Sequence, residues 1–256
     1  MKFWKRGMFF FIINVFSLKL LSQNLIENPS FEEYTSCPDN INQLNRCKGW
    51  WTTDNSSSPE YFNGCSMYNP YKVRVGVPKN FEGYRKAKEG NGYVGIALYG
   101  KNNFNYREYI QTKLLSKLNS GFTYRISAYV SLSDSSKILG DYLSFCFSDK
   151  KDLMTNIMNA PLCSCKDRIV FGEKNYFSKK EWILISSEFK ATGKEVYLTV
   201  GSFKGDYSKS NFKKKANKYK RIGHGYRGNN DSSYLYIDNI SLMCIDCEKV
   251  VKPKFR

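Results

Sequence analysis

The sequence predicts an all-β protein built as a single β-sandwich. Three observations support this fold class. Many short segments alternate apolar and polar residues with a period of two, which is the pattern of half-buried strands. The 256 residues include 19 Tyr and 18 Phe, which strands accommodate better than helices do. The third is that no window carries a sustained apolar stripe at the 3.6-residue period of a helix.

The expected strands follow from this alternation, taken in chain order. The clearest is 122–131, where Tyr124, Ile126, Ala128 and Val130 share one face. Segment 182–186 is apolar on both faces. Segment 53–70 is expected to be a long loop, and 151–158 is a short helical candidate of about two turns. The full set of expected strands is 24–33, 92–98, 106–112, 122–131, 143–147, 182–186, 196–200 and 234–242.

The chain divides into three parts on composition. Residues 1–23 resemble a secretory signal, with Lys2, Lys5 and Arg6 before an apolar stretch that Lys19 interrupts, so no permanent membrane span is expected. Residues 24–247 form the single domain, with a basic, glycine-dotted loop at 204–230. Residues 248–256 form a short basic tail. The mature protein is therefore expected to be exported to the periplasm, the outer-membrane surface or the medium.

The net charge of +17 does not favour a nucleic-acid partner. Lysine supplies most of it, whereas phosphate recognition favours the planar fork of arginine. Removing the signal lowers the charge to about +13. We interpret most of the remainder as a solvated, lysine-rich surface.

Export makes the cysteines disulfide candidates, with pairings that the sequence leaves open. Zinc bound by Cys163, Cys165, Cys244 and Cys247 is the alternative, although a one-residue spacer fits a zinc site poorly. The eight disulfide candidates are Cys37, Cys47, Cys65, Cys146, Cys163, Cys165, Cys244 and Cys247.

Several segments carry a family resemblance. The opening segment 24–32 (NLIENPSFE), the middle segment 90–95 (GNGYVG) and the closing segment 236–242 (YIDNISL) resemble galactose-binding-like jelly rolls, including carbohydrate-binding modules; the run 28–34 (NPSFEEY) carries the closer resemblance described next. With Cys37-Pro38 and the segments 48–50, 61–65, 76–78 and 106–110, the chain resembles a group of exported Bacteroidetes proteins often found upstream of OmpA-like domains. The resemblance implies jelly-roll topology and a non-catalytic binding role.

The same resemblance implies a structural calcium ion. An acidic residue of the first strand and the aspartate of the last strand bind it in related jelly rolls, and these positions match Glu32 and Asp238. Two carboxylates with backbone carbonyls suit the hard-oxygen coordination of Ca²⁺. The alternative is that both carboxylates accept hydrogen bonds in turns or pair with lysines.

Aromatic residues near the 53–70 loop are the expected glycan platform, because sugar CH faces stack on aromatic rings. Trp50 is expected in the core, and Trp51, pointing the opposite way, is the better ligand candidate. The ligand-binding prediction comprises Trp51, Tyr61, Tyr68, Tyr84 and Arg85. A weaker polyanion-binding prediction falls on Lys213, Lys214, Lys215, Lys218, Lys220 and Arg221 of the basic loop.

Catalysis is not expected. His224 is the only histidine and has no obvious carboxylate to orient it, and no acid pair of glycosidase type or Gly-x-Ser-x-Gly motif occurs. The preferred function is therefore non-catalytic binding of a cell-surface or extracellular glycan. The alternatives are a structural or adhesion subunit of an envelope complex, and a glycan hydrolase whose acids are not recognisable in the sequence.

Overall fold

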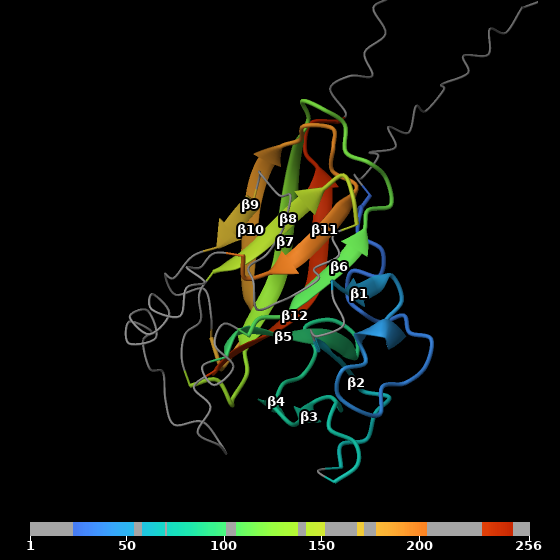
Figure 1. Cartoon of the computed structure of the whole chain (residues 1–256), viewed down its shortest axis with the longest axis vertical. Coiled ribbons are helices and arrows are strands. Elements are labelled where there is room, and N and C mark those ends of the chain that lie inside the picture. Colours follow the sequence, from blue (N-terminus) through green and yellow to red (C-terminus); the bar gives the residue numbers. More distant parts are fainter. Residues whose placement is uncertain are drawn as a thin grey trace, which may run out of the picture.

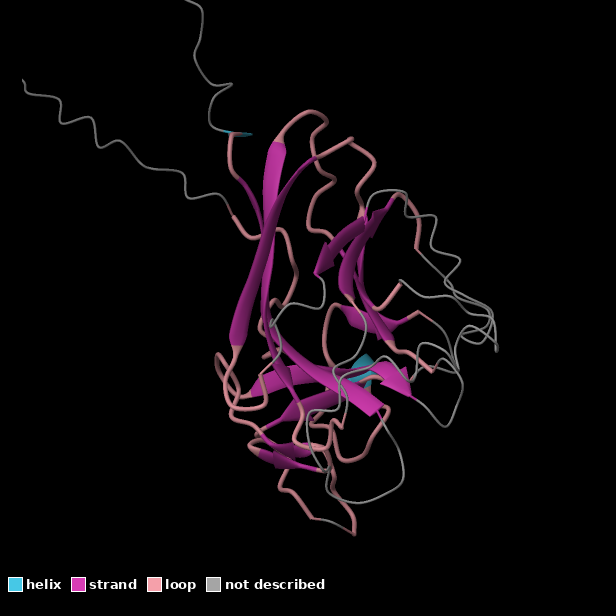
Figure 2. Cartoon of the chain, turned by 90° about the vertical axis from the view of Figure 1, so that its left-hand side faces the viewer, coloured by secondary structure: helices cyan, strands magenta, loops and turns pink. Residues whose placement is uncertain are grey.

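The computed structural model describes residues 23–53, 58–69, 71–100, 106–137, 142–151, 168–171, 178–203 and 232–247. These residues form two five-stranded antiparallel sheets that face one another, so the predicted all-β jelly-roll sandwich is confirmed (Figures 1 and 2). The first sheet has the order β1 (Trp50–Thr52), β6 (Tyr109–Lys113), β11 (Tyr197–Gly201), β8 (Leu143–Ser148), β9 (Arg168–Phe171). The second has the order β10 (Ile183–Lys190), β7 (Thr123–Leu132), β12 (Ser232–Cys244), β5 (Gly92–Gly100), β2 (Glu60–Asn63).

Two small elements complete the described fold. A two-stranded ribbon, β3 (Lys79–Asn80) and β4 (Gly83–Tyr84), lies beyond β2 and β5 at the lower end of the molecule in Figure 1. One 3₁₀ turn, η1 (Leu44–Arg46), precedes β1.

The main core lies between the sheets and is built by the alternation seen in the sequence. Ile126, Ala128 and Val130 of β7 point into it and are fully buried. Leu235 and Ile237 of β12 face the same layer. Burying one apolar face of each sheet against the other supplies the main driving force for this sandwich.

A second, tyrosine-rich core covers the outer face of the second sheet. Phe62, Tyr93, Tyr234 and Tyr236 pack there with Val75 and Ala97. The segment 73–88, which carries β3 and β4, lies over them, because Val77, Phe81 and Ala87 pack against this cluster. We call this covering segment the 73–88 flap. The second sheet is therefore buried on both faces over β2, β5 and β12.

Most expected strands are present, and two sequence predictions are wrong. Segment 24–33 forms only an isolated bridge at Ile26, because Pro29 donates no hydrogen bond and Asn28 and Phe31 adopt positive φ. The predicted loop 53–70 contains β2, which pairs with β5. The strand expected at 182–186 is present as part of β10, where Ile185 faces the core and Leu184, on the other face, is 53% exposed.

The cysteines divide into bonded and free groups. Cys37 bonds Cys65, Cys244 bonds Cys247, and Cys146 is also disulfide-bonded. Because the sulfurs of Cys244 and Cys247 are joined, they are not available to the zinc site considered above. Cys47 is a buried free thiol that accepts a hydrogen bond from Asn28 Nδ2, so its assignment as a disulfide candidate is wrong. Cys163 and Cys165 lie outside the described residues.

Candidate functional site

An open pocket lies where the 73–88 flap meets the segment that enters β10. It has a volume of about 690 Å³ and opens to solvent. Tyr84, 56% exposed, and the half-buried indole of Trp182 supply its aromatic surface. We call it the Tyr84–Trp182 pocket; its lining residues are Tyr84, Arg85, Lys86, Ala87, Lys88, Asp134, Lys179, Lys180, Glu181 and Trp182.

Hydrogen bonds hold the walls of this pocket together. The Arg85 guanidinium donates through one nitrogen to the Lys180 carbonyl at 2.8 Å and through the other to the Lys179 carbonyl. Trp182 Nε1 donates to the Lys86 carbonyl at 2.9 Å, and the Asp134 carboxylate accepts from the Tyr84 amide at 2.8 Å. These bonds join three distant chain segments, so both aromatic rings sit on a preorganised surface.

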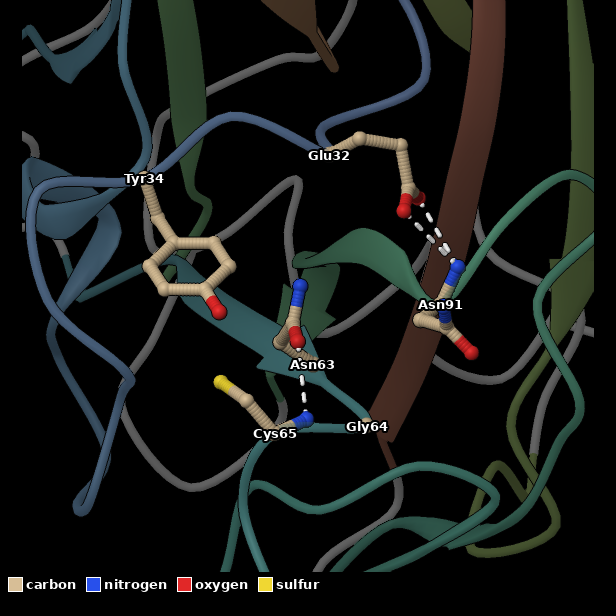
Figure 3. A pocket seen from close by; sticks show the side chains of 6 residues that line it. All are labelled: Glu32, Tyr34, Asn63, Gly64, Cys65 and Asn91. Carbon is tan, nitrogen blue, oxygen red and sulfur yellow. Dashed lines mark hydrogen bonds between the residues drawn. The ribbon is translucent and has the colours of Figure 1, made fainter.

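A second, smaller pocket is lined by Glu32, Tyr34, Asn63, Gly64, Cys65 and Asn91 (Figure 3). Most of its polar groups already form hydrogen bonds within the protein. The Asn91 amide donates to both oxygens of the Glu32 carboxylate, 2.9 Å away, as the dashed lines of Figure 3 mark. Asn63 donates to the Tyr61 hydroxyl and accepts from the Cys65 amide. With one aromatic ring, Tyr34, this pocket offers a ligand less than the Tyr84–Trp182 pocket does.

The two acids of the calcium prediction both hold the turn at 88–92. Glu32 accepts hydrogen bonds from the amides of Asn91 and Gly92. Asp238 is fully buried and accepts from the amides of Lys88, Glu89 and Asn239. Burial raises the pKa of Asp238 to about 7, the amide donors oppose that rise, and the charge of Glu32 adds to it.

The five predicted ligand-binding residues do not form one surface. Tyr84 and Arg85 line the Tyr84–Trp182 pocket. Trp51 lies on the outer face of the first sheet, where its Nε1 donates to Gln111 at 3.0 Å and its ring contacts Tyr197 edge-on. Tyr68 is half-buried, with the Lys79 ammonium 5.1 Å from its ring centroid.

Tyr61 is wrong as a ligand-binding residue. Its side chain is fully buried in the main core, and its hydroxyl donates to the Phe31 carbonyl at 2.8 Å. A sugar could reach it only if the core opened. Its neighbour Phe62 points to the opposite face of β2, into the second core.

Trp182 and Asp134 line the pocket although no sequence pattern predicted them there, and the same holds for a group of buried and half-buried glutamates near the second core. Trp182 was assigned only to a strand, although two lysines closely precede it. Glu60, Glu82 and Glu108 lie far apart in the sequence and share no motif, so only the folded chain brings them near the second core.

These glutamates accept hydrogen bonds from hydroxyl groups. Glu60 accepts from Tyr234, and Glu108 accepts from Tyr106 at 2.5 Å and from Ser58 at 3.0 Å. Burial raises the pKa of Glu60 and of Glu108, and it raises that of Glu82 to about 7. Neutral carboxyl groups are favoured there because removing a charge from water is costly, and the charge of Arg74 opposes this effect only in part at Glu60 and Glu82.

Several predictions fall on residues that the structure does not describe. These are the signal segment at 1–22, the short helical candidate beyond residue 151, the basic loop with Lys213–Arg221, and His224. Among the described residues no helix is long and apolar enough to cross a membrane. Within the same ranges, no three or more His, Cys, Asp or Glu side chains gather as a metal-binding group.

No protein-family model matches the chain, and no curated protein matches it in sequence. Solved structures of similar architecture do exist. The xylan-binding CBM22-1 domain of Paenibacillus barcinonensis Xyn10C shares 10% identity at a TM-score of 0.41, over 88% of this chain and 96% of that one. The K1 cleaved adhesin domain of Lys-gingipain from Porphyromonas gingivalis W83 shares 13% identity at a TM-score of 0.38, over 84% and 96%.

A third similar structure is the enzymatically active domain of tailspike protein 4 from bacteriophage CBA120. It shares 8% identity at a TM-score of 0.40, and the match covers 87% of this chain but 21% of that one. The structural neighbours thus include carbohydrate-binding modules, adhesin domains and one enzyme domain. Identities this low with TM-scores below 0.5 establish neither a ligand nor an activity for this chain.

Proposed function

We propose that this chain is an exported, non-catalytic module that binds a glycan in the Tyr84–Trp182 pocket. The observation that carries the proposal is the exposed Tyr84 ring, which lines the same open pocket as Trp182; apart from Ala87, the other lining side chains are charged. Sugars present apolar CH faces to aromatic rings and hydroxyl groups to polar side chains, and this pocket offers both.

The test is glycan-array binding followed by titration calorimetry on the mature chain. Tyr84→Ala should lower affinity about tenfold or more, as removal of an aromatic anchor does. Tyr71→Ala is the matched control, because Tyr71 is 93% exposed and lies outside the pocket. Trp51→Ala should also retain binding. If Trp51→Ala lost binding and Tyr84→Ala retained it, the glycan would bind on the first sheet and not in the Tyr84–Trp182 pocket.

A hydrolase would instead turn the sugar over. Glycosidases place two carboxyl groups on either side of the scissile bond. Glu60 and Glu108 are fully buried and hold hydroxyl groups, so they do not face a bound glycan. Release of reducing ends from a bound glycan would contradict the non-catalytic role.

An adhesion subunit is the second candidate function, and one observation favours it. Met67 and Tyr71, 87% and 93% exposed, lie on the loop that Asn69 closes by accepting and donating hydrogen bonds with Val73. Exposed apolar side chains on a loop are suited to burial against another protein. Co-purification of an envelope protein that Met67→Ser and Tyr71→Ser abolish, with no sugar affinity, would support this role over glycan binding.

Calcium binding between Glu32 and Asp238 also stays a proposal. Its support is that both carboxylates accept hydrogen bonds from amides of the same turn, 88–92, so two hard-oxygen ligands converge there. Backbone carbonyls would have to supply the other ligands. Adding Ca²⁺ after chelation should raise the Tm of the wild type by several degrees and leave that of Asp238→Asn unchanged. An identical Tm with chelator and with Ca²⁺ would exclude the site.

A further inference from the structure

We propose that the Tyr84–Trp182 pocket selects acidic sugars, those that carry a carboxylate or a sulfate group. This inference rests on the proposed function and names its substrate class. It is carried by a buried arginine that has no anionic partner among the described residues, together with four lysines that line the same pocket.

Arg85 is the central observation. Its side chain lines the pocket yet is 8% exposed, and its two terminal nitrogens donate to neutral carbonyls of Lys179 and Lys180. Its Nε has no hydrogen-bond partner, and no carboxylate lies within ion-pair distance in the described part of the chain. A buried cation held only by neutral groups retains an unbalanced charge that an anion would stabilise.

Four lysines enlarge this positive field. Lys86, Lys88, Lys179 and Lys180 line the same pocket, and none of them forms an ion pair with a described residue. Lys179 Nζ donates to the carbonyls of Asp134 and Ser136, which fixes it at the wall. Lys86 and Lys180 are exposed, so their ammonium groups are available to a ligand.

The pocket is lined by two acidic and five cationic side chains, so the net charge of its lining is positive. Asp134 already accepts the Tyr84 amide, and Glu181 is exposed at the rim. Basic side chains focused around a concave opening attract anions more strongly than isolated surface lysines do. The pocket therefore favours a negatively charged ligand.

The aromatic side chains of the pocket favour a sugar over other negatively charged ligands. The Tyr84 ring is free to stack, and Trp182 is oriented by its bond to Lys86 and by an edge-on contact with Tyr93 at 5.7 Å. A flat apolar ring beside cations matches a pyranose ring that bears an acidic substituent. A simple anion would make no use of the rings.

The experiment compares polymers that differ only in charge. Titration calorimetry on the mature chain would use polygalacturonate against its carboxyl-reduced form, and dextran sulfate against dextran. Polygalacturonate, dextran sulfate or both should bind at least about tenfold more tightly than the neutral counterpart, and added salt should weaken that binding. The two arms show whether the pocket takes a carboxylate or a sulfate.

Matched variants locate the binding. Lys86→Ala with Lys180→Ala should abolish the preference for the acidic polymer, whereas Lys190→Ala with Lys194→Ala, two exposed lysines outside the pocket, should preserve it. Tyr84→Ala should weaken acidic-sugar binding but leave any binding of polyglutamate unchanged. If polyglutamate binds as well as the sugar acids, or if only Lys213→Ala, Lys214→Ala and Lys215→Ala remove binding, the acidic-sugar pocket is wrong.

Failure of this inference is distinguishable from failure of the proposed function. Equal binding of charged and neutral polymers, lost in Tyr84→Ala, would overturn acidic selectivity and leave a glycan-binding module. Binding of no sugar, acidic or neutral, would overturn both.

Discussion

Gly95 lies in β5 opposite Tyr236 of β12 and Glu60 of β2, where two strands converge on the second core. A Cβ at this position would stand 2.3 Å from the Tyr234 hydroxyl and 2.6 Å from the Phe62 ring. Both neighbours are buried aromatic rings packed against others, so neither has room to move. The small residue is therefore required by packing rather than by a turn.

Gly95→Ala should lower the free energy of unfolding by about 1–3 kcal/mol, because overpacking forces buried side chains off their rotamers. Urea unfolding measures the change. Gly64→Ala is the control, since a Cβ there is exposed and meets nothing closer than 3.3 Å. Equal stability of Gly95→Ala and the wild type would show that the second core is loosely packed.

The burial of individual side chains was predicted correctly where it depends only on the apolar–polar alternation of a strand. Trp50 is buried in the main core and its Nε1 donates to the Asn28 carbonyl, while Trp51 points to the opposite face, as expected. Tyr61 failed because its burial depends on β2 pairing with β5, which is a contact between distant segments. The alternation of apolar and polar residues predicts which face of the sheet a side chain points to, but it does not predict which other segment packs against that face.

At the scale of elements, the 73–88 flap contains a group that titrates near neutrality. Glu82 lies between β3 and β4 and accepts hydrogen bonds from Ser133 and Ser135. Burial raises its pKa from the ordinary 4.5 to about 7; the bond from Ser133 opposes this and the charge of Glu108 adds to it. The folded chain therefore binds a proton that the unfolded chain releases between these pH values.

The contribution of Glu82 to the free energy of unfolding should thus be largest below pH 4.5 and should be lost as the pH rises through about 7. We expect Glu82 to contribute a drop of about 2 kcal/mol in the free energy of unfolding between pH 5 and pH 8, measured with chelator present, and Asp238, whose pKa is also raised to about 7, adds to the fall. Glu82→Gln should therefore reduce the slope without removing it, whereas Glu188→Gln, an exposed partner of Arg125, should leave it unchanged. Stability that rises over this range would contradict the assignment.

The disulfide between Cys37 and Cys65 connects the segment before η1 to the end of β2, across a sequence separation of 28. Closing a loop of this length restricts the unfolded chain. Cys37→Ser with Cys65→Ser should therefore cost about 3 kcal/mol in guanidinium unfolding. Cys244→Ser with Cys247→Ser, which opens a separation of 3, is the control and should cost less.

At the scale of the whole molecule, the two sheets share one core, so the described domain should unfold as a unit. Tyr124 of β7, Leu198 of β11 and Leu235 of β12 belong to the same cluster. Far-ultraviolet circular dichroism and tryptophan fluorescence should give coincident thermal transitions. Two separated transitions would show that the second core and the 73–88 flap melt independently.

The sequence by itself determined the fold class, most of the strands and the division into inward and outward faces. It did so because periodic burial is a local property of a strand. The Tyr84–Trp182 pocket was decided only by the tertiary structure. The Arg85 guanidinium donates hydrogen bonds to the backbone carbonyls of Lys179 and Lys180, which are nearly a hundred residues away in the sequence, and so holds these lysines beside Tyr84. Such contacts form between any residue types with free carbonyls, so they leave no pattern in the sequence, and the chemistry of the pocket depends on them.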